Sequence, residues 1–168
     1  MLVMLYSFFM VSLKDIRIIE DDIHRDDRGY FVENYSCKTY MNYGITTNFV
    51  QDNISFSKKD VIRGIHISNQ AKLVQCLHGC IIDVIVDIET KNYLTIMLKG
   101  GDGRHVYIPP GLGHAFIAME DSLVLYKVDQ YYDPKTERGI RWNDPQLNIA
   151  WNISDPIMSE KDKNLSLL

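Results

Sequence analysis

The sequence contains little cysteine, and its cysteines follow no regular spacing. Cys37, Cys76 and Cys80 form an odd set in a chain of 168 residues, so we do not expect a disulfide framework. Reduced thiols are typical of cytosolic proteins, and the sequence therefore predicts a cytoplasmic protein in which these cysteines act as small hydrophobic residues. Cys76, His78 and Cys80 would share one face of a single strand, as metal ligands do. His78–Gly79 predicts a turn, however, which breaks that face.

No block of like charge and no membrane-length apolar segment occurs in the sequence. The formal net charge is -4, whereas nucleic-acid-binding domains carry a basic patch, so we expect no nucleic-acid partner. The opening MLVMLYSFFMV is apolar over only about ten residues, too few to span a bilayer, and it lacks the features of a signal peptide. We therefore expect no membrane partner. Residues 1–11 fit two descriptions, an edge or interface strand or an extension of the fold, because Met4 and Met10 are also candidate starts.

Helical patterns are scarce in the chain. We expect only a turn or two near 38–43 and another begun by Ser159, with Asp162 placed for a capping arrangement. The helical crossovers of a doubly wound α/β fold are missing. Short β-rich runs separated by turn residues lie at 16–20, 29–35, 47–56, 61–67, 72–77, 81–88, 93–98, 105–108, 114–118 and 122–132. This spacing predicts an all-β jelly-roll barrel with short peripheral helices, formed by residues 1–168 as a single domain.

Polar and titratable side chains interrupt the apolar strands. They are Gln51, Asp52, Asn53, Arg63, His66, Lys72, His114 and Tyr126. In a barrel, alternate residues of each strand point inward, so such side chains converge on one interior pocket. Any one of them alone is more often solvated or structurally paired. Several cations buried together, however, need an anionic ligand, and a phosphate-bearing substrate would meet that need.

The segment Gly64–Ser68 has one histidine where metal-binding jelly-roll barrels have two, separated by a single residue. Its sequence is Gly-Ile-His-Ile-Ser, so a divalent cation would lack its ligand set. We therefore expect no metal and no other cofactor. His66 is then free to act as a base.

Eight motifs follow one another along residues 12–163. They are DRGYFVENY at 27–35, FVQDNISFS at 49–57, VIRGIH at 61–66, KLVQCLHGCIIDVIVDI at 72–88, IPPGLGHAF at 108–116, LYKVDQYYDPKTE at 125–137, IRWNDPQLNIAW at 140–151 and SEKD at 159–162. With these motifs the chain resembles the dTDP-4-dehydrorhamnose 3,5-epimerase family of RmlC-like cupins. The resemblance implies an epimerase that inverts C3 and/or C5 of a nucleotide-linked 4-keto-6-deoxy sugar. The substrate that it favours is dTDP-4-dehydro-6-deoxy-D-glucose, converted to dTDP-4-dehydro-L-rhamnose.

The resemblance also implies a role for individual residues. His66 matches the catalytic base, Asp162 the carboxylate that pairs with it, and Tyr126 the acid on the opposite face of the sugar. Lys72 matches the cation near the C4 oxygen. The residues that match substrate-binding positions are Arg28, Phe31, Glu33, Gln51, Asn53, Arg63, His114, Tyr131, Tyr132, Glu137 and Lys161.

The resemblance further implies the partners of the chain. One partner is the nucleotide-diphospho-sugar substrate, and the other is a second copy of the chain. Members of this family form homodimers that exchange N-terminal strands, so Arg28 and Glu33 are expected to serve the neighbouring subunit's site.

The chemistry of the reaction supports these roles. A carbon beside a ketone becomes acidic only when the enolate oxygen is stabilised, which a preorganised cation such as Lys72 does. Histidine in model peptides has a pKa of about 6.5, which suits a general base whose tautomer is held by a carboxylate, and His66 with Asp162 would form such a pair. Inversion removes a proton from one face and returns one to the other, so Tyr126 is a sensible donor across the ring.

Several positions depart from the family pattern. Ser68 stands where glutamine is usual and Gln75 where arginine is common, GLGHAF replaces GFAHGF, and the stretch after 87–89 is shorter. None of these changes affects the positions of the base, its carboxylate or the acid. They do leave the identity of the sugar substrate undecided. The alternatives are a 3- or 5-monoepimerase of another nucleotide-linked 4-keto sugar, a sugar 3,4-ketoisomerase, and a non-catalytic nucleotide-sugar-binding cupin.

Overall fold

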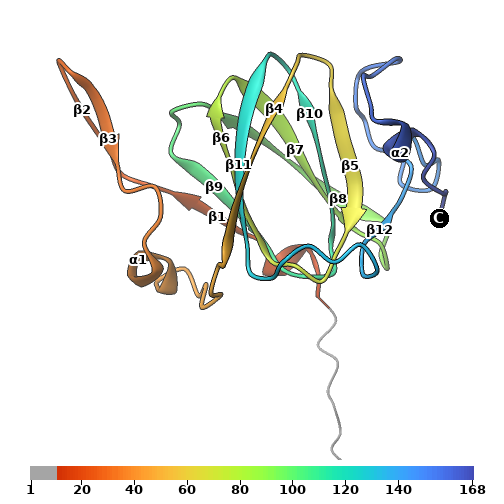
Figure 1. The fold of residues 1–168 in the computed structure, drawn as a ribbon, viewed down its shortest axis with the longest axis horizontal. Helices are drawn as coiled ribbons and strands as arrows, with labels where there is room; N and C mark the ends of the chain where they lie inside the picture. The colour runs from red at the N-terminus through yellow and green to blue at the C-terminus, as the bar shows by residue number, and fades with distance from the viewer. Residues whose placement is uncertain (1–10) are drawn as a thin grey trace, which may run out of the picture.

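The computed structural model describes residues 11–168, which fold into two five-stranded sheets that face each other (Figure 1). The strands are β1 (Arg17–Glu20), β4 (Gln51–Ser57), β5 (Ile62–Ile67), β6 (Lys72–His78), β7 (Cys80–Asp87), β8 (Asn92–Lys99), β9 (Arg104–Ile108), β10 (Gly113–Ala118), β11 (Ser122–Val128) and β12 (Arg138–Gly139). The first sheet has the order β1–β9–β6–β11–β4, and the second has the order β12–β5–β10–β7–β8. This architecture confirms the predicted all-β jelly roll.

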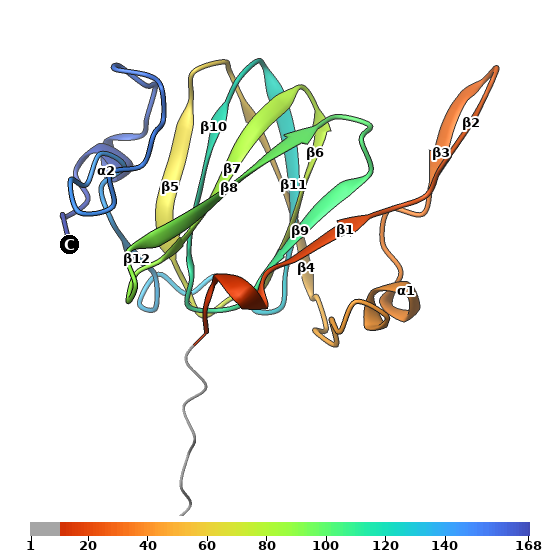
Figure 2. The ribbon, with the colours of Figure 1, turned by 180° about the vertical axis from the view of Figure 1, so that it is seen from behind.

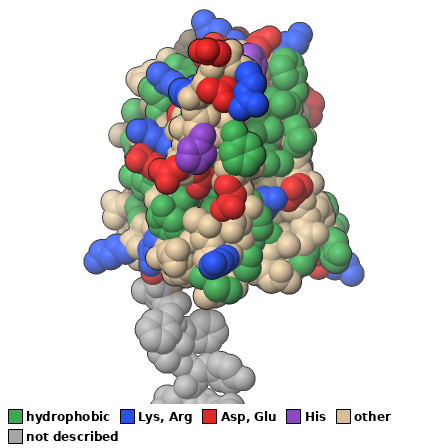
Figure 3. All heavy atoms as spheres, turned by 90° about the vertical axis from the view of Figure 1, so that its left-hand side faces the viewer, with side chains coloured by type: hydrophobic (Ala, Val, Ile, Leu, Met, Phe, Trp, Pro, Cys, Tyr) green, Lys and Arg blue, Asp and Glu red, His purple; other side chains and the backbone are tan. Residues whose placement is uncertain are grey.

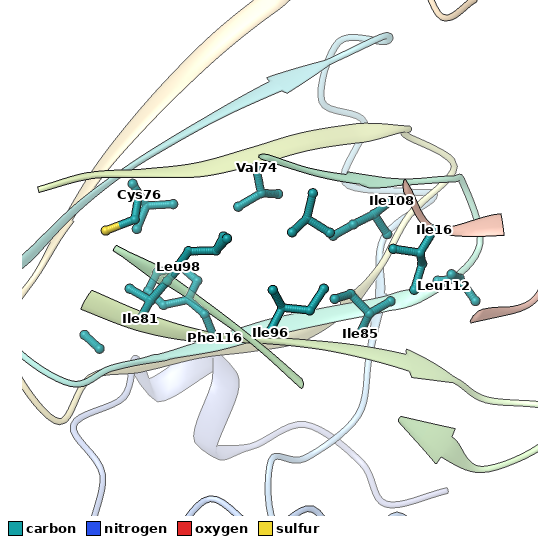
Figure 4. Packing of buried hydrophobic residues seen from close by; sticks show 13 residues of the cluster. Ile16, Val74, Cys76, Ile81, Ile85, Ile96, Leu98, Ile108, Leu112 and Phe116 are labelled. Carbon is teal, nitrogen blue, oxygen red and sulfur yellow. The ribbon is translucent and has the colours of Figure 1, made fainter. Parts of the chain in front are cut away.

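The main core fills the space between the two sheets (Figure 4). Because alternate residues of a strand face opposite sides, Val74 and Cys76 of β6 share one buried cluster with Ile81 and Ile85 of β7. Burying each large aliphatic side chain stabilises the fold by about 1.5–3 kcal/mol. These strands therefore form a rigid frame for the polar residues that lie on the same inner faces.

A second cluster fixes the C-terminal segment to the outer face of the second sheet. Ile140, Leu147 and Trp151 are buried against outward-facing side chains of β5, β7 and β10. The short strand β12 pairs with the edge of β5, where Arg138 lies opposite Ile67. The chain then ends in the helix α2 (Glu160–Lys163), whose cap is Ser159. The consequence for the site is that α2 lies beside β5 (Figure 1).

Strands β2 (Ile23–Asp26) and β3 (Gly29–Val32) form a hairpin that projects from the barrel. Figures 1 and 2 both place this hairpin on the side of the barrel away from α2. Helix α1 (Cys37–Met41) follows it and packs on the outer face of the first sheet, where Tyr40 is buried with Ile19 and Leu73. Near the tip, Arg25 donates a hydrogen bond to the Gly101 carbonyl oxygen of the barrel at 3.1 Å, whereas the turn residue Arg28 is exposed.

The predicted strands agree in place with the observed ones and differ at some ends. The run predicted at 47–56 begins only at Gln51, and the run predicted at 122–132 stops at Val128. Both predicted helices are present, and Ser159 accepts a hydrogen bond from the Asp162 backbone N–H at 3.1 Å, as a cap does. Strands β2 and β12 were not predicted, nor was the 3-10 helix η1 (Leu13–Asp15).

The cysteines are free thiols, with Cys37 exposed and Cys76 and Cys80 buried. Strand β6 ends at His78, and Gly79 turns the chain into β7 with a φ of 81°. A side chain at Gly79 would meet the Asp121 carbonyl oxygen at 2.4 Å, so the turn requires glycine. Within residues 11–168, no helix has the length and hydropathy needed to span a membrane. The prediction for the N-terminal stretch falls almost wholly on residues 1–10, outside the described residues.

Candidate active site

A cavity of about 660 Å³ lies inside the barrel and is lined by strands of both sheets and by the C-terminal segment. The residues predicted from the sequence that line it are Arg63, His66, Lys72, His114, Tyr126, Tyr132, Glu137, Lys161 and Asp162. Its wall mixes these charged groups with apolar side chains such as Phe116 and Val124. A cavity of this size and composition suits a polar ligand of several rings.

His66 and Asp162 form a close pair on one wall of the cavity. The Nε2 atom of His66 lies 2.8 Å from Oδ1 of Asp162, and Oδ2 of Asp162 accepts a hydrogen bond from the Gly64 backbone N–H at 3.3 Å. Burial raises the pKa of Asp162, but the hydrogen bond and charge of His66 outweigh it, with help from Gly64 and Ser159, so the pKa is lowered. Ionised Asp162 therefore holds the Nε2–H tautomer of His66 and leaves the lone pair on Nδ1.

Glycine is required at position 64, immediately before the base. Gly64 has a φ of 118°, and a side chain there would meet the His114 carbonyl oxygen and the Ala115 Cβ at 2.6 Å. This close approach of β5 to β10 places His66 directly opposite His114 in the strand register. The same backbone position points the Gly64 N–H at Asp162.

Glu137 approaches the other ring nitrogen of His66. Its Oε1 atom is 3.9 Å from Nδ1, and its Oε2 atom accepts hydrogen bonds from Tyr132, at 3.1 Å, and from Lys161. Burial raises the pKa of Glu137, but the Lys161 hydrogen bond, the charge of His66 and the Tyr132 hydroxyl together lower it below its usual value. Glu137 is therefore a carboxylate at neutral pH, held at the rim of the cavity.

Lys72 and Tyr126 stand on the wall opposite His66, because β6 and β11 belong to the first sheet and β5 to the second. Burial lowers the pKa of the Lys72 ammonium, although Glu137 and Asp83 oppose part of that shift. Burial raises the pKa of the Tyr126 phenol, which therefore remains protonated at neutral pH. Lys72 and Tyr126 both line the cavity, and within residues 11–168 neither the Lys72 ammonium nor the Tyr126 hydroxyl has a hydrogen-bond partner.

A second histidine–carboxylate pair lies deeper in the cavity. Nε2 of His114 is 2.7 Å from Oδ1 of Asp83, which is 0% exposed, and the other carboxylate oxygen of Asp83 has no partner within the described residues. Sequence reasoning missed Asp83. The signal was present, since a single acid in the apolar run of β7 is rare without a buried partner.

Arg63, Gln51 and Asn53 lie near the open edge of the first sheet. The guanidinium of Arg63 donates to Oγ of Ser57 at 2.9 Å and to the Phe56 carbonyl at 3.0 Å. Gln51 donates to the side chain of Asn53 at 2.7 Å. Gln51 and Asn53 occupy the inward-facing positions of β4 but do not line the cavity. Only Arg63 of this group contributes to its wall.

The remaining predicted residues lie away from the cavity. Arg28 pairs with Asp26, with 2.6 Å between Nη2 and Oδ2, and Phe31 is 69% exposed on the same hairpin. Glu33 accepts a hydrogen bond from Thr39 at 2.9 Å. Tyr131 is exposed in the loop after β11. Figure 3 views the hairpin side, where acidic, basic and apolar side chains are intermixed on the surface.

No metal-ligand cluster was found in the part of the chain that the structure describes. Residues 11–168 contain no group of three or more His, Cys, Asp or Glu placed to hold a metal ion. The pair Cys76 and His78 instead interact locally, since the Cys76 thiol lies 3.0 Å from the His78 carbonyl oxygen.

Known proteins resemble this chain over nearly its whole length. The family model for dTDP-4-dehydrorhamnose 3,5-epimerase matches residues 10–168. The enzyme of that name from Methanothermobacter thermautotrophicus is 36% identical over an alignment of 171 positions, which covers 95% of this chain and 92% of the relative. The Bacillus anthracis enzyme, solved with TDP and PPi bound, has a TM-score of 0.89 and 36% identity, covering 95% and 98% of the two chains.

A second solved structure carries a sugar nucleotide. The epimerase from Legionella pneumophila, in complex with dTDP-4-keto-L-rhamnose, has a TM-score of 0.86 and 37% identity, covering 94% of this chain and 89% of its own. This chain shares the fold of both solved structures over most of its length. The chain therefore belongs to the dTDP-4-dehydrorhamnose 3,5-epimerase family.

Proposed function

We propose that the chain converts dTDP-4-dehydro-6-deoxy-D-glucose to dTDP-4-dehydro-L-rhamnose by inverting C3 and C5 beside the C4 ketone. The observation that carries this proposal is the His66–Asp162 pair, which faces the uncommitted Tyr126 phenol across one cavity. A base on one wall and an acid on the other suit the inversion of a ring held between them. The family relationship supports the same substrate.

The first step is the removal of a proton from a carbon beside the ketone. Nδ1 of His66 carries the free lone pair, because Nε2 is committed to Asp162. As the proton leaves, negative charge moves to the C4 oxygen, and the Lys72 ammonium stabilises it there. Electrostatic stabilisation of this kind contributes about 2.7–4 kcal/mol for a single donor.

The second step returns a proton to the opposite face of the ring. Tyr126 is the donor, because it lies on the first sheet and burial keeps its phenol protonated. The enolate collapses to the ketone as the phenolic proton reaches carbon. One inversion therefore leaves His66 protonated and Tyr126 as a phenolate.

Cationic groups at the rim of the cavity support binding of the nucleotide diphosphate. Arg63 and Lys161 line the cavity with His114. Lys161 and His114 have acidic partners, Glu137 and Asp83, whereas Arg63 donates to Ser57 and the Phe56 carbonyl. A diphosphate would compensate the charge on Arg63 and compete for Lys161, which favours a phosphorylated ligand over a neutral sugar.

A homodimer would complete the site. Arg28, Phe31 and Glu33 lie on or beside the β2–β3 hairpin, on the side of the barrel away from α2 and outside the cavity of their own chain. We infer that the hairpin reaches the cavity of a second copy, as the family resemblance implies. We also place this enzyme in the cytoplasm, with the whole chain acting as a single cupin domain.

Subunit complementation tests the dimer. Mixing His66→Ala subunits with subunits that lack a working hairpin, such as Arg28→Ala with Glu33→Ala, forms heterodimers in which one site has both intact parts. At substrate concentrations well below KM, where weakened binding leaves the hairpin variant little activity, we expect the refolded mixture to reach up to about a quarter of wild-type activity, from the statistics of random pairing. A mixture no more active than its two components would show that each hairpin serves its own chain.

Product analysis by NMR tests the reaction itself. With dTDP-4-dehydro-6-deoxy-D-glucose we expect inversion at both C3 and C5. Inversion at one carbon would identify a monoepimerase, and migration of the ketone would identify a ketoisomerase. Tight binding of dTDP without any reaction would identify a non-catalytic binding protein.

A further inference from the structure

Two carboxylates bracket the His66 ring, and they differ in their access to solvent. Asp162 lies 2.8 Å from Nε2 and is only 5% exposed. Glu137 lies 3.9 Å from Nδ1, and its second oxygen contacts Tyr132 and Lys161. The side chain of Lys161 is 58% exposed, and Tyr132 is 56% exposed. A path of polar groups therefore leads from Nδ1 through Glu137 to the surface, whereas Asp162 ends in the protein interior.

The proposed reaction needs such a path. After one inversion the proton taken from carbon is on Nδ1 of His66, and Tyr126 has lost its own proton. No second abstraction begins until the imidazolium has released that proton, because a protonated imidazole is not a base. Asp162 contacts the other nitrogen, Nε2. Transfer from Nε2 to Asp162 would therefore leave a proton in the interior, still hydrogen-bonded to the ring. The next abstraction, at the second carbon or in the next turnover, therefore depends on an exit from Nδ1.

We propose that Glu137 accepts the proton from His66 Nδ1 after each abstraction and passes it to solvent. The Nδ1–H bond breaks, its electron pair stays on nitrogen, and an O–H bond forms on Oε1. A bridging water or a rotation of the carboxylate closes the 3.9 Å gap. Glu137 then loses the proton to bulk water, and Tyr126 regains one from water, so the cycle is balanced. This role rests on the proposed epimerase function and differs from the substrate contact that the family resemblance implied for Glu137.

The surroundings of His66 single out Glu137 for this step. The charged or titratable groups that face the ring are Asp162 from α2, His114 from the paired strand β10, Lys72 and Tyr126 from the opposite wall, and Glu137 before β12. Lys72 is a cation, and the Tyr126 phenolate lies on the opposite wall, across the bound sugar. His114 is paired with the fully buried Asp83, so a proton passed to it would stay in the interior. Glu137 is the anion in this group that also has neighbours at the surface.

The test is a rapid-mixing measurement on Glu137→Gln, with enzyme in slight deficit over the sugar nucleotide. Glutamine keeps the size of the side chain but accepts no proton. We expect the first abstraction to stay close to the wild-type rate and every later one to slow by about 10- to 100-fold, giving a burst. Added formate, a small carboxylate, should restore the later abstractions in proportion to its concentration. Glu137→Asp should fall between wild type and Glu137→Gln.

The matched control is Glu160→Gln, which removes an exposed carboxylate of the neighbouring helix that pairs with Lys163 outside the cavity. It should show no burst and no response to formate. The proposal is wrong if Glu137→Gln raises the dTDP dissociation constant without a burst or formate rescue, since that identifies a ligand contact only. It is also wrong if this variant turns over like wild type. Wild-type protein that exchanges no substrate proton would instead overturn the epimerase function.

Discussion

The cavity and the β2–β3 hairpin carry predicted functional residues in opposite structural settings. In the cavity, His66 is held by Asp162, which is itself fixed by Gly64 and the Ser159 cap. On the hairpin, Arg28 has only a neighbour two residues away, and the large Phe31 ring is exposed. The first region is built by the packing of its own chain. The residues predicted to bind substrate on the hairpin do not line the cavity of their own chain. This placement is expected if the hairpin contributes to the site of another subunit.

The physical basis of this difference is the amount of apolar surface behind each region. The cavity residues stand on strands whose other inward side chains form the main core. A two-stranded hairpin alone is marginally stable in water, and this one contributes no residue to the three buried clusters, although Arg25 donates a hydrogen bond to the Gly101 carbonyl oxygen of the barrel at 3.1 Å. Changes in the cavity should therefore affect the chemical step, and changes on the hairpin should affect binding.

The largest effect is expected at the base. His66→Ala removes the group that takes the substrate proton, and no other base is proposed for this abstraction, since His114 of the paired strand is held by the fully buried Asp83. Deuterium exchange at C3 and C5 should fall essentially to background, whereas dTDP should still bind through the other contacts. NMR exchange and calorimetric titration measure the two properties. Exchange near the wild-type rate would refute the assignment of His66.

Lys72 is expected to show the next largest effect and to set the alkaline limit of activity. Lys72→Met should lower kcat by about 10²- to 10³-fold, the usual loss on removing one donor to an oxyanion. Burial lowers the pKa of Lys72 below its ordinary value of 10.5, so the cation is lost, and kcat falls, as pH rises toward that value. Tyr126, whose pKa is raised, remains protonated in this range. A pH–rate profile in which Lys72→Arg leaves the alkaline limb unmoved would contradict this account.

Asp162→Asn should have a smaller effect than either change. The imidazole remains, but its tautomer and orientation are less well held, and we expect a loss of about 10- to 100-fold, the range found for carboxylates that orient histidines in metal sites. Steady-state kinetics beside the Glu160→Gln surface variant measure this loss. An Asp162→Asn enzyme as active as that control would show that the pair at 2.8 Å has no catalytic part.

Arg28→Ala should have the smallest effect on the chemical step. If the hairpin binds the nucleotide of a neighbouring subunit, the loss of one charged hydrogen bond raises KM by about 10-fold and lowers kcat much less. Initial rates over a range of substrate concentrations separate the two constants. A fall in kcat with unchanged KM would place Arg28 in the chemistry and remove the contrast between hairpin and cavity.

The sequence predicted those parts of the fold whose signals are local. The alternation in β4, where Asn53 and Ser55 face inward and Ile54 and Phe56 outward, follows the period of two that marks a half-buried strand. The Ser159 cap was likewise readable from residue type and spacing. Strand β2 was missed because it is short and mostly polar, and β12 because it is a two-residue strand at the edge of its sheet. Neither has an alternating apolar pattern.

The site was predictable only where a family resemblance supplied long-range information. His66 and Asp162 are 96 residues apart, and no local pattern joins them. Without the resemblance, Tyr126 would have been taken as a core tyrosine. The contact between Glu137 and His66, and the pair His114 with Asp83, depend on packing between strands distant in sequence. Such contacts come from the fold as a whole rather than from any segment.

The central claim is that two walls of one cavity divide the reaction, with the base on one and the acid on the other. Tyr126→Phe in deuterated water tests it most directly, because His66 and Lys72 remain and an enolate still forms. We predict deuterium exchange into unreacted substrate at the carbons that the wild type inverts, returned by His66 to the original face. Inversion itself should fall by about 10²- to 10⁴-fold. Inversion by Tyr126→Phe at the wild-type rate would contradict the account.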